Sequence, residues 1–370
     1  MKKKLAVIYA NSDQIPLVEK AKEMGIETHC FAWDKEERHC VCKGVADYFH
    51  PISVLEKEQI LDACKKIKID GVTSIMKDLA VPTVAYVAQN MGLTGNGYEN
   101  VLIARDKYST RQAFIKNKVN SPRFAISEEG EIPNLTGFKY PLIVKPADSR
   151  DSIGVMKVDS EKDLQHAIFF AQQNTSLRHV VIEEFIDGSE HSVDSISWKG
   201  KHYVLAIKDK ELSENYKALG KHYPSRLSLK IQETMKAETV KALDSINYRN
   251  GASNTQFKVA ESGEIYSIEI NPRMAGDYSF ETVQLHNGYD YLKGVIDIAL
   301  GRFEEPVFTY YKYSGLHYLH QETEWVRQLI EKRDCEKEII RAEFYKKDEI
   351  IGGKEGYFLY QSDKKRNWKP

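Results

Sequence analysis

The chain has 370 residues and a mass of 42.5 kDa, a length that predicts roughly two or three domains. Hydrophobic residues make up 42% and charged residues 29%, which excludes an intrinsically disordered chain. The 53 basic and 54 acidic residues give a net charge of −1, which argues against a protein that coats nucleic acid.

No membrane span or secretory signal is predicted. The longest wholly apolar stretches, such as 167–171, span only a few residues, whereas a membrane helix needs about 20. The basic start is followed by an apolar run from Leu5 to Ala10 only, and the five cysteines lack the spacing of a disulfide scaffold. We therefore expect a cytoplasmic protein with reduced thiols and no membrane partner.

The first hundred residues alternate between strand and helix patterns. Strands are expected at 4–10, 26–33 and 69–75, and helices at 14–24, 55–67 and 80–91. This alternation predicts the parallel sheet of a Rossmann-like domain. The glycine fingerprint of dinucleotide binding is absent after the first strand, where ANSDQIP stands, so neither NAD nor FAD is assigned.

A glycine- and asparagine-rich segment at 92–100 predicts a domain boundary, and a helix is expected over 101–117. From residue 140 the pattern becomes strand-rich, with YPLIVKP, IGVMKV and HVVIEEF as strands around one amphipathic helix that begins near Leu164. After residue 302, strand-like pieces between charged helices predict a small capping lobe.

Two features of the middle segment suit phosphate binding. Lys145 lies near the end of the apolar strand PLIVKP, which places an ammonium where a phosphate could sit, although a snorkelling lysine at a sheet edge fits the same pattern. The loop 147–155 contains small residues, among them Ser152 and Gly154, and its amides could cradle an anion. An ordinary polar hairpin loop is the alternative for this loop.

The segment VIEEFIDGSE, residues 181–190, ends a strand and enters a loop. Its backbone groups could meet an adenine edge, and Glu190 could accept hydrogen bonds from ribose hydroxyls. The alternative is a surface strand with solvated acids.

The strongest pattern is the hairpin NTQFKVAESGEIYSIEINPR, with a two-residue turn expected at Ser262-Gly263. That register places Gln256 opposite Glu269, and Asn271, two residues further on, points to the same face. Three hard oxygen donors suit Mg²⁺, which also takes ligands from substrate phosphates. A polar sheet face with its own salt bridges is the alternative.

These motifs, in this order, resemble the ATP-grasp superfamily, and within it the carboxylate–amine or carboxylate–thiol ligases. The resemblance implies an α/β and α+β architecture in which an ATP-grasp fold clasps ATP between two lobes. It divides the chain into a Rossmann-like pre-ATP-grasp domain (1–95), a first lobe with the central ATP-binding subdomain (96–185), a second lobe with the metal site (186–302) and a small C-terminal capping segment (303–370).

The resemblance also implies roles for individual residues. The ATP-binding set is Lys107, Lys145, Ser152, Gly154, Glu183, Glu184, Phe185, Ile186 and Glu190. The metal ligands are Gln256, Glu269 and Asn271, which hold Mg²⁺, with Mn²⁺ as the other candidate. The catalytic set is Arg273, which steadies the transferring phosphoryl group, together with Lys208, Lys221 and His222, in or beside a loop at 209–223 that closes over the substrate.

Two positions depart from the family pattern. Gln256 stands where the family usually has a carboxylate, which removes a negative charge from the metal site. The loop 147–155 is poorer in glycine than usual. In contrast, residues 199–230 contain eight basic and three acidic residues, a local charge of +5 that predicts a cationic pocket wall.

The implied reaction is ATP-dependent: a small-molecule carboxylate is phosphorylated to an acyl phosphate, and an amine displaces the phosphate to form an amide. Two alternatives remain open, a nucleotide-binding protein with weak or no catalysis, which Gln256 motivates, and a phosphotransferase with a stable phosphorylated product. A homodimer is an expectation from similar enzymes. His317 and His320 could share a helix face as metal ligands, but the sequence shows no third ligand.

Overall fold

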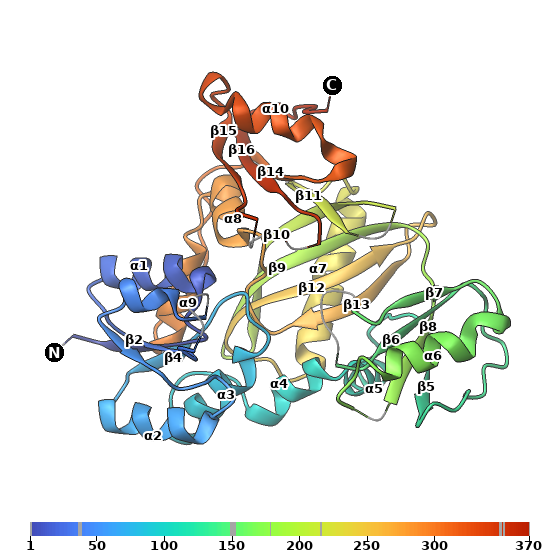
Figure 1. Cartoon of the computed structure of the whole chain (residues 1–370), viewed down its shortest axis with the longest axis horizontal. Coiled ribbons are helices and arrows are strands. Elements are labelled where there is room, and N and C mark those ends of the chain that lie inside the picture. The colour runs from blue at the N-terminus through green and yellow to red at the C-terminus, as the bar shows by residue number, and fades with distance from the viewer. Residues whose placement is uncertain are drawn as a thin grey trace.

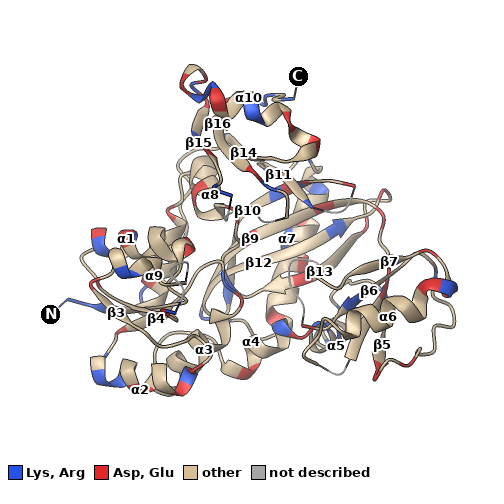
Figure 2. Ribbon diagram, viewed as in Figure 1, with Lys and Arg blue, Asp and Glu red and all other residues tan. Residues whose placement is uncertain are grey.

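The structure is a computed structural model that describes residues 2–35, 39–148, 153–177, 179–214, 217–347, 350 and 352–369. It contains three sheets, which Figure 1 shows as an N-terminal unit at the left, a small sheet at the right and a large central sheet between them. Basic and acidic residues are interspersed over much of the ribbon (Figure 2). No helix among the described residues is long and apolar enough to cross a membrane.

The N-terminal unit is a parallel sheet, as predicted from the alternating pattern. It has four strands in the order β3-β2-β1-β4, of which β3 was not predicted. Its strands are β1 (Lys4–Ile8), β2 (Glu27–Phe31), β3 (Tyr48–His50) and β4 (Gly71–Thr73). Its helices are α1 (Ile15–Glu23), α2 (Lys57–Ile67) and α3 (Ala80–Met91). Four consecutive residues of β1, from Leu5 to Ile8, are fully buried because helices cover both faces of the sheet.

The single helix expected over 101–117 is in fact two, α4 (Tyr98–Arg105) and α5 (Lys107–Lys116). Asp106 between them is extended, and its carboxylate accepts hydrogen bonds from the backbone of Tyr108 and Ser109. This side-chain cap starts a new helix at Lys107.

The small sheet is antiparallel, in the order β5-β8-β6-β7. Its strands are β5 (Phe124–Glu128), β6 (Leu142–Pro146), β7 (Met156–Val158) and β8 (His179–Glu184). Helix α6 (Leu164–Gln172) buries Leu164, Ala167, Ile168 and Ala171, the apolar positions at helical spacing in the sequence.

The large sheet has eight strands in the order β13-β12-β9-β10-β11-β14-β16-β15. The strands are β9 (Ser189–Trp198), β10 (Lys201–Leu212), β11 (Ala218–Tyr223), β12 (Gly251–Val259), β13 (Ile265–Asn271), β14 (Tyr313–Leu319), β15 (Ile339–Phe344) and β16 (Gly356–Ser362). The helices of this part are α7 (Leu229–Ser245), α8 (Ser279–Asn287), α9 (Tyr291–Ala299) and α10 (Trp325–Glu331). Short 3₁₀ turns lie at Ser12–Gln14, Val41–Gly44, Glu161–Asp163, Gln321–Thr323 and Arg333–Cys335.

Strands β14, β15 and β16 continue this sheet, because β14 pairs with β11 (Figure 1). The strand-like pieces after residue 302 therefore form strands as expected. The histidine pair expected on one helix face is wrong: His317 lies within β14, and His320 caps the turn that follows.

The structure corrects two local predictions around the site. Much of the segment expected as a closing loop, 209–223, is instead the antiparallel pair β10 and β11. The hairpin turn is wider than two residues, since the last pair is Val259 with Ile265. A bulge after Gln256 restores the register, so Gln256 does pair with Glu269 as predicted.

Candidate active site

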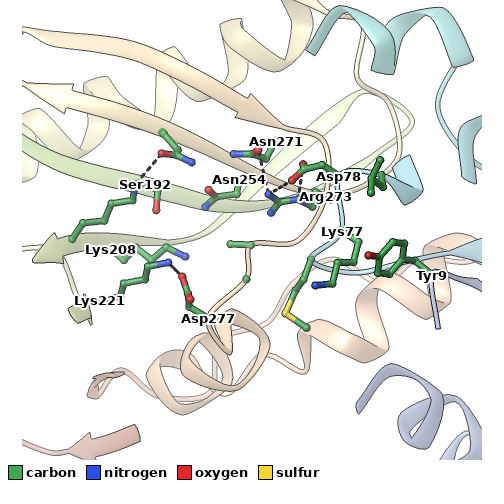
Figure 3. A pocket seen from close by; sticks show the side chains of 16 residues that line it. Tyr9, Lys77, Asp78, Ser192, Lys208, Lys221, Asn254, Asn271, Arg273 and Asp277 are labelled. Atoms are coloured by element: carbon green, nitrogen blue, oxygen red, sulfur yellow. Dashed lines mark hydrogen bonds and ion pairs between the residues drawn. The ribbon is translucent and has the colours of Figure 1, made fainter. Parts of the chain in front are cut away.

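A cavity of about 460 Å³ lies where the large sheet meets the N-terminal unit (Figure 3). Its walls come from the segment after β4, from strands β9 to β13, and from the loop after β13. The lining residues are Tyr9, Met76, Lys77, Asp78, Leu79, Ser192, Lys208, Lys210, Lys221, Asn254, Gln256, Asn271, Arg273, Ala275, Gly276 and Asp277. The sequence predicted five of them as site residues: Lys208, Lys221, Gln256, Asn271 and Arg273.

The cavity carries more positive than negative charge, with five cationic and two acidic lining side chains. Burial lowers the pKa of Lys208. Burial, followed by the nearby charges of Lys208, Lys210 and Lys354, lowers the pKa of Lys221 well below its ordinary value. Crowded buried ammonium groups are stabilised by an anion, so the cavity is suited to a phosphate or a carboxylate.

Lys208 is held in place by a buried network. Its Nζ lies 2.9 Å from Oδ2 of Asp194 and 2.9 Å from Oγ of Ser279. Asp194 also accepts hydrogen bonds from the Tyr223 hydroxyl at 2.6 Å and from Nδ2 of Asn254 at 3.0 Å. The ammonium of Lys208 therefore has a fixed position in the cavity wall.

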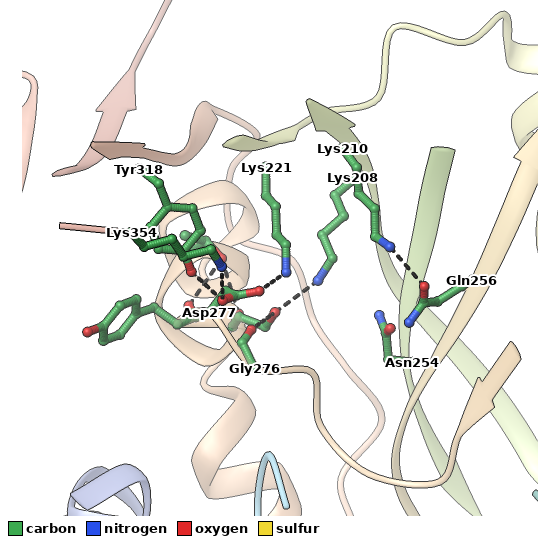
Figure 4. A network of polar contacts seen from close by, with 12 residues as sticks. Lys208, Lys210, Lys221, Asn254, Gln256, Gly276, Asp277, Tyr318 and Lys354 are labelled. Atoms are coloured by element: carbon green, nitrogen blue, oxygen red, sulfur yellow. Dashed lines mark hydrogen bonds and ion pairs between the residues drawn. The ribbon is translucent and has the colours of Figure 1, made fainter. Parts of the chain in front are cut away.

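Lys221 points into the cavity from β11 and contacts the carboxylate of Asp277 (Figure 4). The Tyr318 hydroxyl donates to the same carboxylate, and Nζ of Lys354 lies 3.6 Å from it. Sequence reasoning missed Asp277, Tyr318 and Lys354, because the last two come from the weakly patterned tail and no motif includes Asp277.

His222 does not reach the cavity. Neighbouring residues of a strand point to opposite faces, so His222 faces away from the side that Lys221 lines. Its Nδ1 lies 3.0 Å from the Tyr360 hydroxyl. The prediction that His222 contacts substrate is therefore not supported by its position.

Arg273 joins the large sheet to the N-terminal unit. Its Nε and Nη2 donate to the two carboxylate oxygens of Asp78 at 2.7 and 2.8 Å, a bidentate pair. Nη2 also lies 3.4 Å from Oδ1 of Asn271. Asp78 is a second site residue that the sequence did not reveal, since it follows a strand without a recognisable motif.

The three expected metal ligands lie on adjacent strands β12 and β13. Nε2 of Gln256 donates to Oε2 of Glu269 at 3.2 Å, and Oε1 of Gln256 accepts from Lys210 at 2.8 Å. Nζ of Lys107 lies 3.9 Å from Oε1 of Glu269. These contacts bring Lys107 from the start of α5 to the same place as the oxygen donors.

Lys145 is buried on the small sheet. Its Nζ lies 2.6 Å from Oε2 of Glu183, whose Oε1 accepts from Nε of Arg111 at 2.8 Å. Arg111 also donates to the backbone oxygen of Ile268 on β13 at 2.8 Å, so this cluster connects the small and large sheets. Burial lowers the pKa of Lys145 to about 8, although Glu183 opposes the shift.

The predicted adenine segment, residues 181–190, comprises the end of β8, the turn after it and the start of β9. The backbone N–H groups of Glu184 and Phe185 already donate to the oxygens of Arg123 and Pro141. An adenine edge would therefore have to meet other backbone groups of the segment, such as those of Ile186. Glu183 is committed to its ion pairs and is only 3% exposed, so its side chain does not face a ligand.

The remaining predicted ATP ligands lie around this segment. Glu190 forms ion pairs with Lys210 at 3.3 Å and Lys258 at 3.4 Å. Gly154 has φ +76°, and a Cβ there would lie 2.6 Å from the Pro146 ring, so this position requires glycine. Ser152 lies outside the described residues.

Residues 104–277 match the family model of the ATP-grasp domain, which confirms the resemblance seen in the sequence. The alanine–anticapsin ligase of Bacillus amyloliquefaciens is 25% identical over 304 residues, covering 69% of this chain and 62% of the relative. The chain thus spans less than two thirds of the length of the first curated relatives that it matches, and only 24% of a carbamoyl phosphate synthase large chain.

Two solved structures share the fold along 98% of this chain. The L-amino acid ligase from Bacillus licheniformis has a TM-score of 0.81 with 21% identity and is covered over 94% of its length. N5-carboxyaminoimidazole synthetase from Staphylococcus aureus, complexed with ADP, has a TM-score of 0.81 with 16% identity and is covered over 95%. The predicted fold class is therefore confirmed.

Proposed function

We propose that this chain, whose residues 104–277 form an ATP-grasp domain, is an ATP- and Mg²⁺-dependent ligase that joins a small-molecule carboxylate to an amine. A substrate carboxylate attacks the γ-phosphate of ATP, giving an acyl phosphate and ADP. The amine then attacks the acyl carbon and releases phosphate. The names of the relatives, an alanine–anticapsin ligase and an L-amino acid ligase, support this class of reaction.

The observation that carries the proposal is the cationic cavity beside the oxygen donors. Phosphoryl transfer needs positioned positive charge more than covalent help from the protein. Lys208, Lys221 and Arg273 line one cavity and are held there by carboxylates. They would stabilise the negative charge of a phosphoryl group and of the carboxylate that attacks it.

We place the nucleotide between the small and large sheets. Lys145 and Lys107 would contact the phosphates, and Glu190 would accept hydrogen bonds from the ribose. The adenine would lie at Phe185 and Ile186, where the ring of Phe185 is flanked by Lys157 at 4.5 Å from its centroid. Nζ of Lys145 donates a hydrogen bond to Oε2 of Glu183, and this contact fixes the position of the ammonium group.

Glu269, Asn271 and Gln256 fit a Mg²⁺ ion that takes its other ligands from phosphate and water. All three carry side-chain oxygens, and the hydrogen bond from Nε2 of Gln256 to Oε2 of Glu269 holds these two side chains next to each other. Only Glu269 is charged, so this chain provides less negative charge than a set with two acids. A bound Mg²⁺ would supply charge neutralisation for the phosphates.

The test is phosphate release from Mg²⁺-ATP across a panel of carboxylates paired with amines, with mass spectrometry of the products. An amide whose formation matches ADP release supports the proposal. Nucleotide binding without release for any pair would favour the binding-protein alternative, and a stable phosphorylated product would favour a phosphotransferase. The Arg273→Ala variant is expected to lose release while it still binds ATP.

A homodimer remains a prediction, because the structure contains a single chain. Light scattering coupled to size-exclusion chromatography measures the mass in solution. A mass of one chain across the working concentration range would contradict the dimer.

A further inference from the structure

On the face of the large sheet opposite the cavity, three potential metal ligands from three adjacent strands converge. They are Glu211 on β10, His222 on β11 and His317 on β14. Oε2 of Glu211 lies 3.5 Å from Nε2 of His222 and 3.7 Å from Nδ1 of His317, and the three ligand atoms all lie within 4.8 Å of one another.

The strand register explains why these side chains meet. Gly220 pairs with Glu211 on one side and with His317 on the other, so it leaves a gap between them. His222, two residues along β11, turns its ring over that gap. A Cβ at Gly220 would lie 2.6 Å from Nε2 of His222 and 3.2 Å from Oε2 of Glu211. The space that the three ligands share exists because Gly220 has no side chain.

Both histidines are buried, and each has a ring nitrogen that lacks a hydrogen bond. His222 and His317 are each 7% exposed. Nε2 of His222 and Nδ1 of His317 have no hydrogen-bond partner among the described residues. A buried polar atom without a partner costs about 1–3 kcal/mol, so two of them aimed at one point call for a ligand.

We propose that Glu211, His222 and His317 bind a divalent transition-metal ion, with Zn²⁺ as the representative. Two imidazoles and one carboxylate are a known zinc ligand set that leaves a fourth position for water. Ligand atoms about 2.0–2.1 Å from a tetrahedral ion lie about 3.4 Å apart, close to the two separations in the structure. This ligand set differs from the all-oxygen set expected for Mg²⁺.

The surroundings of the cluster also suit a metal. The Tyr360 hydroxyl contacts Nδ1 of His222 at 3.0 Å, which orients the ring so that Nε2 faces the cluster. The side chain of Glu211 is 42% exposed, which gives an ion a path from solvent.

The site would tie β14 to β10 and β11, the two strands of the three that also line the cavity from the other side. His222 follows Lys221 directly on β11, and Glu211 follows Lys210 on β10. A bound ion would therefore stabilise the strand that presents Lys221. Zinc binding does not depend on the proposed ligase reaction, and it is measured without ATP or substrates.

The first experiment titrates Zn²⁺ into metal-stripped protein by calorimetry, with a large excess of Mg²⁺ present to occupy oxygen sites. We expect one Zn²⁺ per chain and a rise in Tm on binding. His317→Ala removes a ligand and is expected to weaken Zn²⁺ binding by about 100-fold or more. Removing a residue that only hydrogen-bonds a ligand costs about 10- to 100-fold. His286→Gln, a control at an equally buried histidine outside the cluster, should bind as wild type does.

Gly220→Ala provides a second test that keeps all three ligands, because the added methyl group fills the gap between them. It too should lose Zn²⁺ binding, while circular dichroism checks that it folds. Co²⁺ in place of Zn²⁺ should show the intense visible absorption of a four-coordinate site, and His222→Gln should lose it. No Zn²⁺ binding by the wild type, or binding unchanged in both His317→Ala and Gly220→Ala, would overturn the proposal and leave a histidine pair that shares a proton with Glu211.

Discussion

The two ends of the proposed active site hold their lysines differently. At the nucleotide end, Lys145 and Arg111 share one carboxylate, that of Glu183, and both of its oxygens are used. Because Arg111 also reaches the backbone of Ile268, this cluster is part of the connection between two sheets. Here the cations belong to the framework of the fold.

At the other end, the cavity, three lysines crowd one another. Lys208 and Lys210 are the nearby charges that, after burial, lower the pKa of Lys221. Lys221 shares Asp277 with Lys354, so one carboxylate again serves two cations. The charge here is stabilised fully only when an anionic ligand is bound.

Because of this difference, we expect lysine substitutions at the two ends to affect folding stability differently. Removing a lysine at the nucleotide end should cost folding stability as well as ligand affinity, because it leaves a buried carboxylate with one partner fewer. Removing Lys221 from the crowded cavity should cost activity and leave stability unchanged or higher, because it relieves repulsion while Asp277 keeps its other partners.

The largest effect is expected from Lys145→Met. The loss of a charge-assisted hydrogen bond to phosphate costs about 1.5–3 kcal/mol, or roughly 10- to 150-fold in ATP affinity, measured by calorimetry. Breaking a buried ion pair also costs about 3–5 kcal/mol of unfolding free energy, measured in urea. Lys162→Met, at an exposed lysine in the turn before α6, is the matched control. Unchanged nucleotide affinity in Lys145→Met would show that the phosphates bind elsewhere.

Lys221→Met should be the counterpart at the cavity. We expect kcat/KM to fall by roughly 10- to 150-fold, because a buried cation near the reacting groups is worth about 1.5–3 kcal/mol. The unfolding free energy should not fall, since Asp277 keeps the contacts with Lys354 and Tyr318. If Lys221→Met were destabilised as much as Lys145→Met, the contrast between the two ends would be lost.

The sequence predicted the framework of this site well where a motif sets a local geometry. Cross-strand pairing placed Gln256 opposite Glu269, and alternation along β13 placed Asn271 on the same side. The prediction of an apolar strand with Lys145 near its end was also correct. These predictions depend on periods of two residues and on short-range pairing, which the sequence encodes directly.

The sequence did not predict contacts between distant elements. Asp78 meets Arg273 across 195 positions, and Arg111 meets Glu183 across 72. The sequence around an acidic or basic residue does not indicate which distant residue will form an ion pair with it. The expected loop at 209–223 is mostly strand because β11 finds a partner in β14, a pairing that only the tertiary fold provides.

A smaller effect is expected from Gln256→Glu, which tests the metal end of the site. The new carboxylate would lie beside Glu269 and add one negative charge, so the Mg²⁺ concentration for half-maximal activity should fall by about tenfold, the effect of roughly 1.4 kcal/mol. Lys210 would form an ion pair with the new acid and limit the gain. Gln173→Glu, at an exposed position after α6, controls for the added charge. Identical Mg²⁺ dependence in both variants would place the metal away from Gln256.

The smallest effect is a pH dependence that separates binding from stability at one residue. Lys145 has a pKa of about 8 in the folded protein against an ordinary value of 10.5, so between these values the folded chain has released a proton that the unfolded chain still holds. Its contribution to stability therefore rises with pH in this window, since the unfolded state binds more protons. ATP affinity should move the opposite way, falling about fourfold from pH 7 to pH 8.5 as the ammonium loses its charge. Lys145→Met should show neither trend, so the difference between the two proteins isolates this group. Parallel changes of affinity and stability with pH in the wild type would mean that Lys145 stays charged, and that Glu183 outweighs burial at this end of the site.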